Sequence, residues 1–304
     1  MQQTRRTFLS TSAAAGLAAL AAPRIVQAAL SIGDAQIDVV SDGSLRLPGS
    51  FLYGPMPQDE LLPLLQFHDQ PLETVIRPCN VTLLRHGDRV VLFDVGSGYD
   101  FAPTAGELVD SLDMLGVAPE DVTDVVFTHG HPDHLWGLLD DFDDLLFADA
   151  RFLIGKTEWD YWIDPNTVDR IGESRASFAA GAKRRLERIE DAVNFFGDGE
   201  EILPGVAARA TFGHTPGHMA FEVRSGTEAV MIIGDAIGDE HVAFARPDWH
   251  SGADQDQAAG AAARQSLLDQ LAQEQMRLIG FHFAGNGIGR VERADGAYRF
   301  VAEG

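Results

Sequence analysis

The chain has a single cysteine, Cys79, among its 304 residues, and this excludes an internal disulfide bond. The folded state must therefore be stabilised by packing and by any metal ions that the protein binds. For Cys79 itself, a metal-binding thiol and a small buried side chain both stay open. We expect the buried role, because free cysteines are usually buried structural residues.

Basic residues are also scarce: 23 Lys and Arg stand against 46 Asp and Glu, for a net charge of -23. A surface with this charge repels nucleic acid and anionic lipid, so we expect no nucleic-acid partner and no nuclease activity. With 45% apolar and 23% charged residues, the composition is typical of a soluble globular protein.

No apolar run is long enough to serve as a membrane anchor. The run from Ala13 to Ala22 is much shorter than the ~20 residues that span a bilayer. It follows Arg5 and Arg6 and precedes Val26-Gln27-Ala28, which offers small residues for cleavage. Residues 1–28 therefore resemble a twin-arginine export signal, and we expect a periplasmic or secreted protein without a stable membrane anchor.

Strands and helices alternate through residues 29–304 without an internal repeat, so we expect one α/β domain there. Asp42-Gly43 and Gly87-Asp88 each predict a hairpin between flanking strands, at 37–40 and 44–47 and at 81–85 and 90–93. Other strands are expected at 122–127, 151–154, 206–211, 220–223, 229–233 and 277–281, with a closing hairpin over 289–301. Helices are expected at 104–115, 173–193 and 256–275. Two sheet-rich halves with outer helices predict a four-layer αββα sandwich.

Histidine is rare, at 10 residues, yet His129, His131 and His134 fall within six positions. His129 and His131 are two apart after an apolar strand, so their rings can point the same way. Pro132 then bends the chain, and Asp133 and His134 leave from the start of a helix toward neighbouring space. This spacing predicts four metal ligands, two for each of two metal ions.

Three later residues complete the candidate set. His214 lies in the glycine-bounded loop Gly213–His218, Asp235 follows an apolar strand, and His282 follows the last long strand. Each signal is weak alone, because a strand-end aspartate is usually a cap or turn residue. All three, however, lie at the carboxyl ends of predicted strands, where loops commonly build functional sites.

These motifs resemble those of the metallo-β-lactamase superfamily. The His-x-His-x-Asp-His run, His214, Asp235 and His282 occur in the order of that family, and Asp94 in Leu92-Phe93-Asp94-Val95-Gly96 is similar to its first motif. The resemblance covers residues 30–304. It implies that His129, His131 and His214 hold one metal, that Asp133, His134 and His282 hold the other, and that Asp235 bridges them. Asp94 and His218 would orient the ligands.

The resemblance also implies a mechanism. Two divalent ions, zinc first and manganese, iron or cobalt as alternatives, would share a water and lower its pKa from ~15.7 toward ~7. The bridging hydroxide would attack an ester, lactone or phosphotriester, and Asp133 could pass a proton to the leaving group. Asp133 and Asp235 are the expected catalytic residues, the substrate is a small molecule, and a homodimer is left open.

A finer resemblance is to methyl parathion hydrolase and related exported enzymes. It rests on Asp42–Pro48, Gly213–His218, Asp160-Tyr161-Trp162 and the ending Gly287–Val291. By this resemblance Trp162 lines the mouth of the substrate pocket, with Phe101 and Phe283 as further candidates, and aromatic walls favour apolar or aryl substrates. The homoserine-lactone hydrolases often have a tyrosine three residues after the bridging aspartate, where this chain has Gly238.

Two other functions stay open at this level. A mononuclear-iron persulfide dioxygenase would use the first three histidines and the aspartate and leave the second site empty. A non-catalytic metal-binding protein would keep the ligands without the reaction. The complete second set of Asp133, His134 and His282 argues against the dioxygenase, and the retention of all seven ligand types disfavours the non-catalytic protein.

Overall fold

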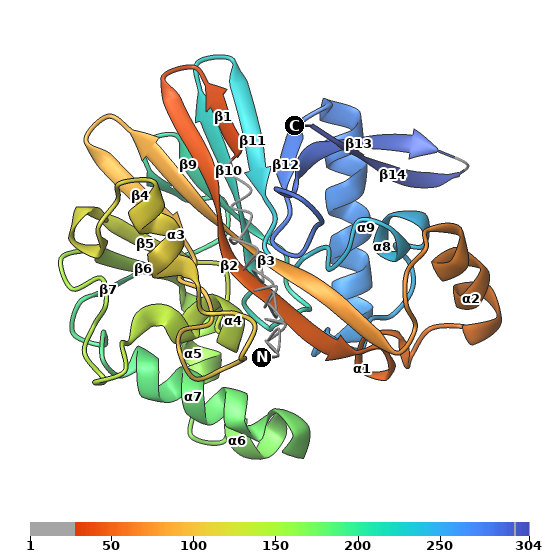
Figure 1. The fold of residues 1–304 in the computed structure, drawn as a ribbon, viewed down its shortest axis with the longest axis horizontal. Helices are drawn as coiled ribbons and strands as arrows, with labels where there is room; N and C mark the ends of the chain where they lie inside the picture. The colour runs from red at the N-terminus through yellow and green to blue at the C-terminus, as the bar shows by residue number, and fades with distance from the viewer. Residues whose placement is uncertain (1–27, 295, 304) are drawn as a thin grey trace, which may run out of the picture.

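The computed structural model describes residues 28–294 and 296–303, which form two seven-stranded β-sheets (Figure 1). The first sheet contains, in spatial order, β1 (Ala28–Ile32), β2 (Ala35–Pro48), β3 (Thr74–His86), β4 (Arg89–Phe93), β5 (Asp124–Phe127), β6 (Arg151–Gly155) and β7 (Val193–Phe196). The second contains β14 (Ala297–Ala302), β13 (Ile288–Ala294), β12 (Arg277–Ile279), β11 (Glu228–Ile232), β10 (Met219–Ser225), β9 (Val206–Ala210) and β8 (Glu201–Leu203).

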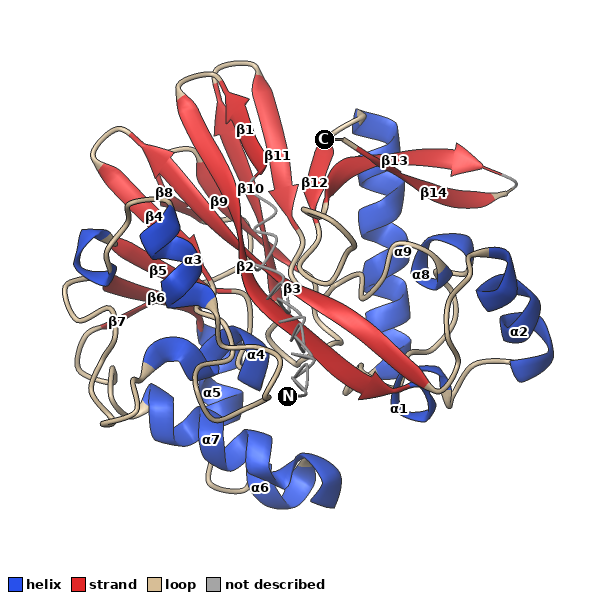
Figure 2. Ribbon diagram, in the orientation of Figure 1, coloured by secondary structure: helices blue, strands red, loops and turns tan. Residues whose placement is uncertain are grey.

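Helices cover the outer faces of the two sheets, with the strands between them (Figure 2). The α-helices are α1 (Gly49–Tyr53), α2 (Gln58–Phe67), α3 (Leu108–Met114), α4 (Pro132–Leu135), α5 (Lys156–Ile163), α6 (Thr167–Arg170), α7 (Ala176–Leu186), α8 (Val242–Ala245) and α9 (Gln257–Glu274). Buried side chains of α3, α5 and α7 pack on the first sheet, and those of α9 pack on the second. The predicted four-layer αββα sandwich is confirmed.

The interior between the sheets is apolar. Along each strand every second side chain points inward, and these side chains are mostly apolar. Phe93 of the first sheet and Phe221 of the second meet with their ring centroids 5.3 Å apart. Val126, Leu84 and Val230 belong to the same buried cluster. Strand β5 is buried along its whole length, since α-helices cover one of its faces and the second sheet covers the other.

The two hairpin predictions have different outcomes. The one at Gly87-Asp88 is confirmed, because β3 and β4 pair as antiparallel neighbours across it. The one at Asp42-Gly43 is wrong, because both residues lie inside β2, which shifts register against β3 between Ser41 and Ser44. Gly43 has φ of 90°, so the turn signal marks a β-bulge in a continuous strand.

The helix predicted over 173–193 is shorter in the structure. The α-helix α7 ends at Leu186, and the chain then turns into β7, which pairs in parallel with β6. Val193 and the aromatic pair Phe195-Phe196 suit an edge strand better than a helix, and this preference overrides the helical periodicity. The helix predicted over 256–275 and the closing hairpin are confirmed as α9 and as β13 with β14.

The fold brings the carboxyl ends of several strands together at one end of the sandwich. Asp94 follows β4, His129 follows β5, Asp235 follows β11, and His282 follows β12. The pairs β4–β5 and β11–β12 are parallel, so within each sheet these residues emerge at the same edge. The predicted export signal lies outside the described residues, and none of the helices in the described part combines the length and apolar character of a membrane span.

Candidate metal centre

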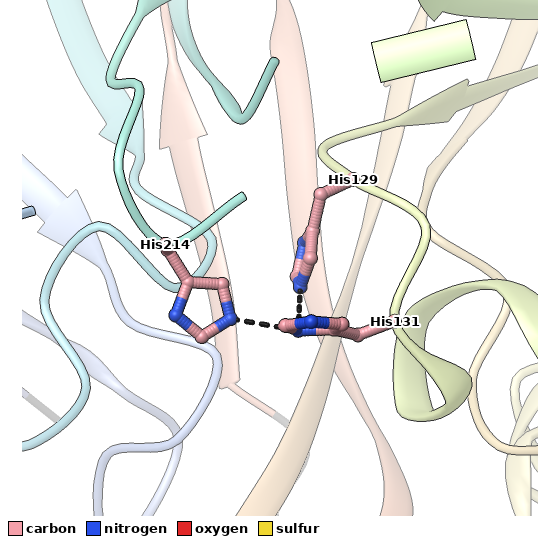
Figure 3. A group of neighbouring side chains, drawn as sticks. All are labelled: His129, His131 and His214. Carbon is pink, nitrogen blue, oxygen red and sulfur yellow. Dashed lines mark hydrogen bonds between the residues drawn. The ribbon is translucent and has the colours of Figure 1, made fainter. Parts of the chain in front are cut away.

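Three histidines form one half of the candidate centre. The Nε2 atom of His129 lies 3.0 Å from Nδ1 of His131, and that same Nδ1 lies 2.9 Å from Nε2 of His214 (Figure 3). His129 and His131 come from the loop after β5, whereas His214 comes from the loop after β9, on the other sheet. The close approach of three imidazole nitrogens from two sheets is the arrangement that the sequence predicts.

The other half contains Asp133, His134 and His282, and Asp235 contacts both halves. Nε2 of His282 lies 3.2 Å from Oδ2 of Asp133, and Nε2 of His134 lies 3.5 Å from the same oxygen. Oδ2 of Asp235 lies 3.2 Å from Nε2 of His214 and 3.3 Å from Nε2 of His282, and its Oδ1 lies 3.2 Å from Nε2 of His134. The seven predicted residues therefore lie together, and all are buried.

Neighbouring acceptors fix which nitrogen of each ring carries a proton. Nδ1 of His134 donates to the Asp94 carboxylate at 2.7 Å, and Nδ1 of His214 faces the Asp254 carboxylate at 3.3 Å. Nδ1 of His282 donates to the Pro78 carbonyl at 2.8 Å. These three rings in their neutral form therefore present the lone pair of Nε2 toward the centre.

His129 is held in the same form through a hydroxyl. The Thr128 hydroxyl donates to Oδ2 of Asp94 at 2.7 Å, so at 2.9 Å from Nδ1 of His129 it acts as the acceptor. His129 then also directs a lone pair of Nε2 inward. Asp94 has φ of 67°, an uncommon backbone conformation for a residue with a side chain, and it accepts from Thr128 as well as from His134.

The predicted orienting role of His218 is consistent with its contacts. Its Nδ1 contacts the Thr211 hydroxyl at 2.7 Å, and its Nε2 accepts from the backbone N–H of Asp235 at 2.9 Å. Gly234, which precedes Asp235, has φ of 51°, and a Cβ there would collide with the His218 ring. His218 therefore contacts the backbone of Asp235, while its own nitrogens both point away from the centre.

The protonation state of each histidine at the centre depends on its burial and on its distance from the carboxylates. Burial lowers the pKa of His129 and of His131 well below the ordinary value, and neighbouring histidines lower it further, so both rings are neutral. Burial also opposes a charge on His214, but Asp235 outweighs it and raises the pKa of His214 to about 9. Burial likewise opposes a charge on His134 and on His282, but Asp235 and Asp133 together outweigh it and raise the pKa of both histidines well above the ordinary value.

A divalent cation fits this set of donors. Oδ2 of Asp133, Nε2 of His134 and Oδ1 of Asp235 are buried and lack a hydrogen-bond partner among the described residues. Buried polar atoms are normally paired, and here lone pairs of nitrogen and carboxylate oxygen face one another. Imidazole and carboxylate are ligands that zinc and similar divalent metals accept. Both metal sets predicted from the sequence thus have the donor chemistry that they need.

Glu158 connects the two loops that carry the candidate histidine ligands. This buried carboxylate accepts four hydrogen bonds, from Gly130 N at 2.8 Å and Trp162 Nε1 at 2.5 Å on Oε1, and from Thr215 Oγ1 at 2.7 Å and Gly217 N at 2.9 Å on Oε2. Gly130 lies between His129 and His131, whereas Thr215 follows His214. Among 46 acidic residues, no spacing or motif distinguishes this one.

A cavity opens over the candidate centre, and His131, Asp133, His214, Asp235 and His282 form its floor. Its walls are mainly apolar and include Leu45, Leu47, Phe51, Phe101 and Phe178. Phe101 is therefore on the cavity wall, where the resemblance puts it, and it packs against Trp136 and Phe178. Such a mostly apolar cavity with a polar floor is typical of small-molecule sites.

The other two aromatic predictions are wrong. Trp162 is 1% exposed and does not line the cavity, because its indole N–H is bound by Glu158 and its ring packs beside His131. Phe283 is 0% exposed and packs against Phe244 and Phe300 beneath α9. Both side chains belong to the protein interior. The ring of Trp162 contacts the side chain of His131.

Cys79 is buried, as expected, and lies close to Asp133 and His282. Burial raises the pKa of its thiol to about 12, and a hydrogen bond to His282 opposes that rise only in part. Without a cation bound beside it, the thiol is therefore protonated at neutral pH. Cys79 packs against the second half of the centre as a small neutral side chain.

The chain belongs to the metallo-β-lactamase superfamily. A sequence profile of the Metallo-beta-lactamase superfamily matches residues 74–282, well over half of the chain and a span that contains all seven candidate ligands. A probable metallo-hydrolase of Mycobacterium tuberculosis is 27% identical over 182 residues, covering 52% of this chain and 56% of the relative. The metallo-beta-lactamase domain-containing protein 1 of Xenopus laevis is 38% identical over 80 residues, covering 26% of this chain and 30% of the relative. The chain thus spans about half or less of the length of these curated relatives.

Solved structures share the fold across almost the whole chain. A dizinc quorum-quenching lactonase, AidC, solved with a product N-hexnoyl-L-homoserine, superposes with a TM-score of 0.86 at 24% identity, covering 91% of this chain and 97% of that one. The hydrolase AbOPH superposes with a TM-score of 0.84 at 24% identity and the same coverage. At this level of identity the likeness to both structures shows a shared fold.

Proposed function

We propose that this protein is a dinuclear metallohydrolase that cleaves uncharged lactones, carboxylic esters or phosphotriesters. His129, His131 and His214 would hold one divalent ion, Asp133, His134 and His282 would hold the second, and Asp235 would contact both. Zinc is the first choice for both ions. The finer likeness to methyl parathion hydrolase and the export predicted from residues 1–28 belong to this proposal, with the activity in the periplasm or outside the cell.

The observation that carries the proposal is the position of Asp235. Its two oxygens lie within 3.3 Å of Nε2 atoms from three histidines, one in the first half of the centre and two in the second. A mononuclear site would need only the first half. The pairing of Asp133 with both His134 and His282 instead favours a second complete set of ligands, and this disfavours a mononuclear-iron dioxygenase.

Two bound divalent ions would supply Lewis acidity and lower the pKa of water at the centre. The chain's own residues supply the rest. Asp133 lies on the cavity floor, where its carboxylate can take the proton released by the attacking water and pass it to the leaving oxygen. The apolar wall of Leu45, Leu47, Phe101 and Phe178 excludes bulk water and accommodates an apolar group of the substrate.

The charges on the cavity wall favour an uncharged substrate. Arg77 pairs with Asp239 at 3.3 Å, and Arg264 pairs with Asp254 at 3.4 Å. Arg175 donates to the carbonyls of Gly252 and Ala253. Arg77 and Arg264 are thus each paired with a carboxylate and are not free to bind a substrate carboxylate or phosphate monoester, and two hydrogen bonds to carbonyls hold the Arg175 side chain in place. The solved lactonase of the same fold is in keeping with a neutral cyclic ester.

Replacing Asp235 with Ala tests the proposal. Loss of the shared carboxylate should reduce metal content below two ions per chain and abolish hydrolysis of a panel of lactones, aryl esters and phosphotriesters. The exposed Asp141→Ala variant is a matched control that should keep both. Metal content is measured by elemental analysis of purified protein. A D235A protein that retained two ions and full activity, or a wild type with one iron that consumed oxygen with a persulfide, would contradict the proposal.

A further inference from the structure

One corner of the cavity contains polar groups that the hydrolytic chemistry does not use. Arg77 from β3 and Tyr53 from α1 both line the cavity, and they are 6% and 3% exposed. Nη2 of Arg77 donates to the Tyr53 hydroxyl at 3.5 Å and to Oδ2 of Asp239 at 3.3 Å. A buried guanidinium and a buried phenol thus lie side by side at the wall of an otherwise apolar chamber.

This corner is held rigidly. Oδ1 of Asp239 accepts from the backbone N–H groups of His241, Val242 and Ala243 at the start of α8, which leaves Oδ2 for Arg77. Tyr53 packs in the apolar cluster that joins α1 and α2 to α8. Two donor groups fixed in this way lose little freedom when a ligand binds, and preorganised donors bind better than mobile ones.

Both groups have donor capacity to spare. Arginine carries five N–H donors, and in the part of the chain that the structure describes only Nη2 of Arg77 has hydrogen-bond partners. The Tyr53 hydroxyl accepts from Arg77, while its own hydrogen finds no protein acceptor among those residues. Burial raises the pKa of Tyr53 to about 12, and Asp239 adds to the rise, so the hydroxyl keeps its proton at neutral pH.

The space beside these donors is open. Gly238 lines the cavity between Asp235 and Asp239 along the chain, and a Cβ built on it would meet no atom within 4 Å. Donors at a cavity wall that have no protein acceptor bind water or a ligand oxygen. Because Arg77 is already neutralised by Asp239, the acceptor that suits them is an uncharged oxygen.

We propose that Tyr53 and Arg77 form a specificity site that binds a neutral carbonyl oxygen of the substrate away from the scissile bond. The proposal rests on the hydrolase function above and narrows it to esters or lactones whose apolar part carries a second carbonyl group, as a ketone or an amide. The carbonyl oxygen accepts from the Tyr53 hydroxyl and from Arg77, and the hydrocarbon on either side of it contacts the leucine and phenylalanine wall.

A binding measurement tests this proposal without any turnover. The probe is 1-hexyl-2-pyrrolidinone, a lactam that combines a carbonyl oxygen with an alkyl chain, titrated calorimetrically into zinc-loaded protein. We expect wild type to bind it, and Tyr53→Phe and Arg77→Lys each to weaken binding about fivefold, the loss of one hydrogen bond. Tyr298→Phe, which removes a hydroxyl bound to Asp269 on the exposed surface, should leave the affinity unchanged.

A kinetic measurement uses matched esters: 4-nitrophenyl octanoate beside the 4-, 5-, 6- and 7-oxo-octanoates. In wild type at least one oxo ester should exceed the plain ester about tenfold in kcat/KM, and Tyr53→Phe and Arg77→Lys should each reduce that ratio about fivefold. Equal rates for all five esters, or a ratio and a lactam affinity that neither substitution changes, would overturn the specificity site. If wild type binds the lactam but hydrolyses no ester or lactone, the proposed function fails while the carbonyl site stands.

Discussion

The carboxylate of Glu158 connects the loops that carry His131 and His214, and its replacement by Gln should loosen the whole centre. All four of its partners donate, so the position requires a group that only accepts. A glutamine brings two N–H donors to one side. The Thr215 hydroxyl can rotate and accept one of them, so the amide nitrogen should face Thr215 and Gly217.

In that orientation one donor, the backbone N–H of Gly217, meets another donor and is left without a partner, at a cost of about 1–3 kcal/mol. The remaining three hydrogen bonds change from charge-assisted to neutral and lose roughly 1 kcal/mol each. Burial raises the pKa of Glu158, and the four donors offset this only in part, so removing the charge returns some of the loss. The net destabilisation is on the order of 3–5 kcal/mol, a large part of the stability of a typical domain.

Urea denaturation of the zinc-loaded protein measures this difference directly, and zinc competition with a chelator measures the affinity of the centre. We expect Glu158→Gln to lower the zinc affinity by about 10–100-fold, the usual effect of removing a group that orients metal ligands. Asp160→Asn on the same helix removes only an exposed contact with Lys156 and should cost at most about 0.5 kcal/mol. A Glu158→Gln protein as stable as Asp160→Asn, with unchanged zinc affinity, would refute the reasoning.

Two further outcomes follow from the same contacts. The pKa of His214 is about 9 in the fold against 6.5 unfolded, so its protonated form contributes stability that is complete below pH 6.5 and is lost as the pH rises through about 9. In chelator-treated protein, the free energy of unfolding measured by urea denaturation should therefore fall by roughly 3 kcal/mol between pH 6.5 and pH 9.5. Zinc-loaded protein should not show this fall, and a free energy of unfolding that does not change with pH in the absence of zinc would contradict the prediction. Trp162→Ala should destabilise the fold by about 3–5 kcal/mol because the indole is fully buried, and an unchanged urea midpoint would show that it is not part of the interior.

The clustering of the seven candidate ligands could be predicted from the sequence because their positions depend on the backbone. His129, Asp235 and His282 each follow the end of an apolar strand by two or three residues, and a parallel sheet brings such ends to one edge. The rarity of histidine made the cluster visible. The same local patterns predicted the β3–β4 hairpin and α9, whose signals lie within a few residues of each other.

The predictions that were wrong concern residues whose positions depend on contacts with residues far away in the sequence. Asp42-Gly43 has the chemistry of a hairpin turn, but the carboxylate accepts from the N–H groups of Ser97 and Leu108, and this interaction holds the residue inside a bulged strand. Trp162 lies in an aromatic-rich segment near the site, yet it is buried because Glu158, which binds its indole, is itself held by the distant residues Gly130 and Gly217. Neither partner can be identified from the residues that surround the motif.

In this fold, the candidate metal ligands have positions set by the local sequence, whereas the residues that would select the substrate have positions set by distant contacts. The ligands stand at strand ends that the two sheets fix in place. Tyr53 and Arg77, by contrast, depend on how α1, the far end of β3 and α8 pack together, through side chains such as Leu61 and Trp249. These elements extend beyond the sandwich, where β2 and β3 continue toward α1 (Figure 1). Because different elements set the two properties, the donors on the cavity wall can change without disturbing the candidate metal ligands, so substrate choice can diverge while the centre stays the same.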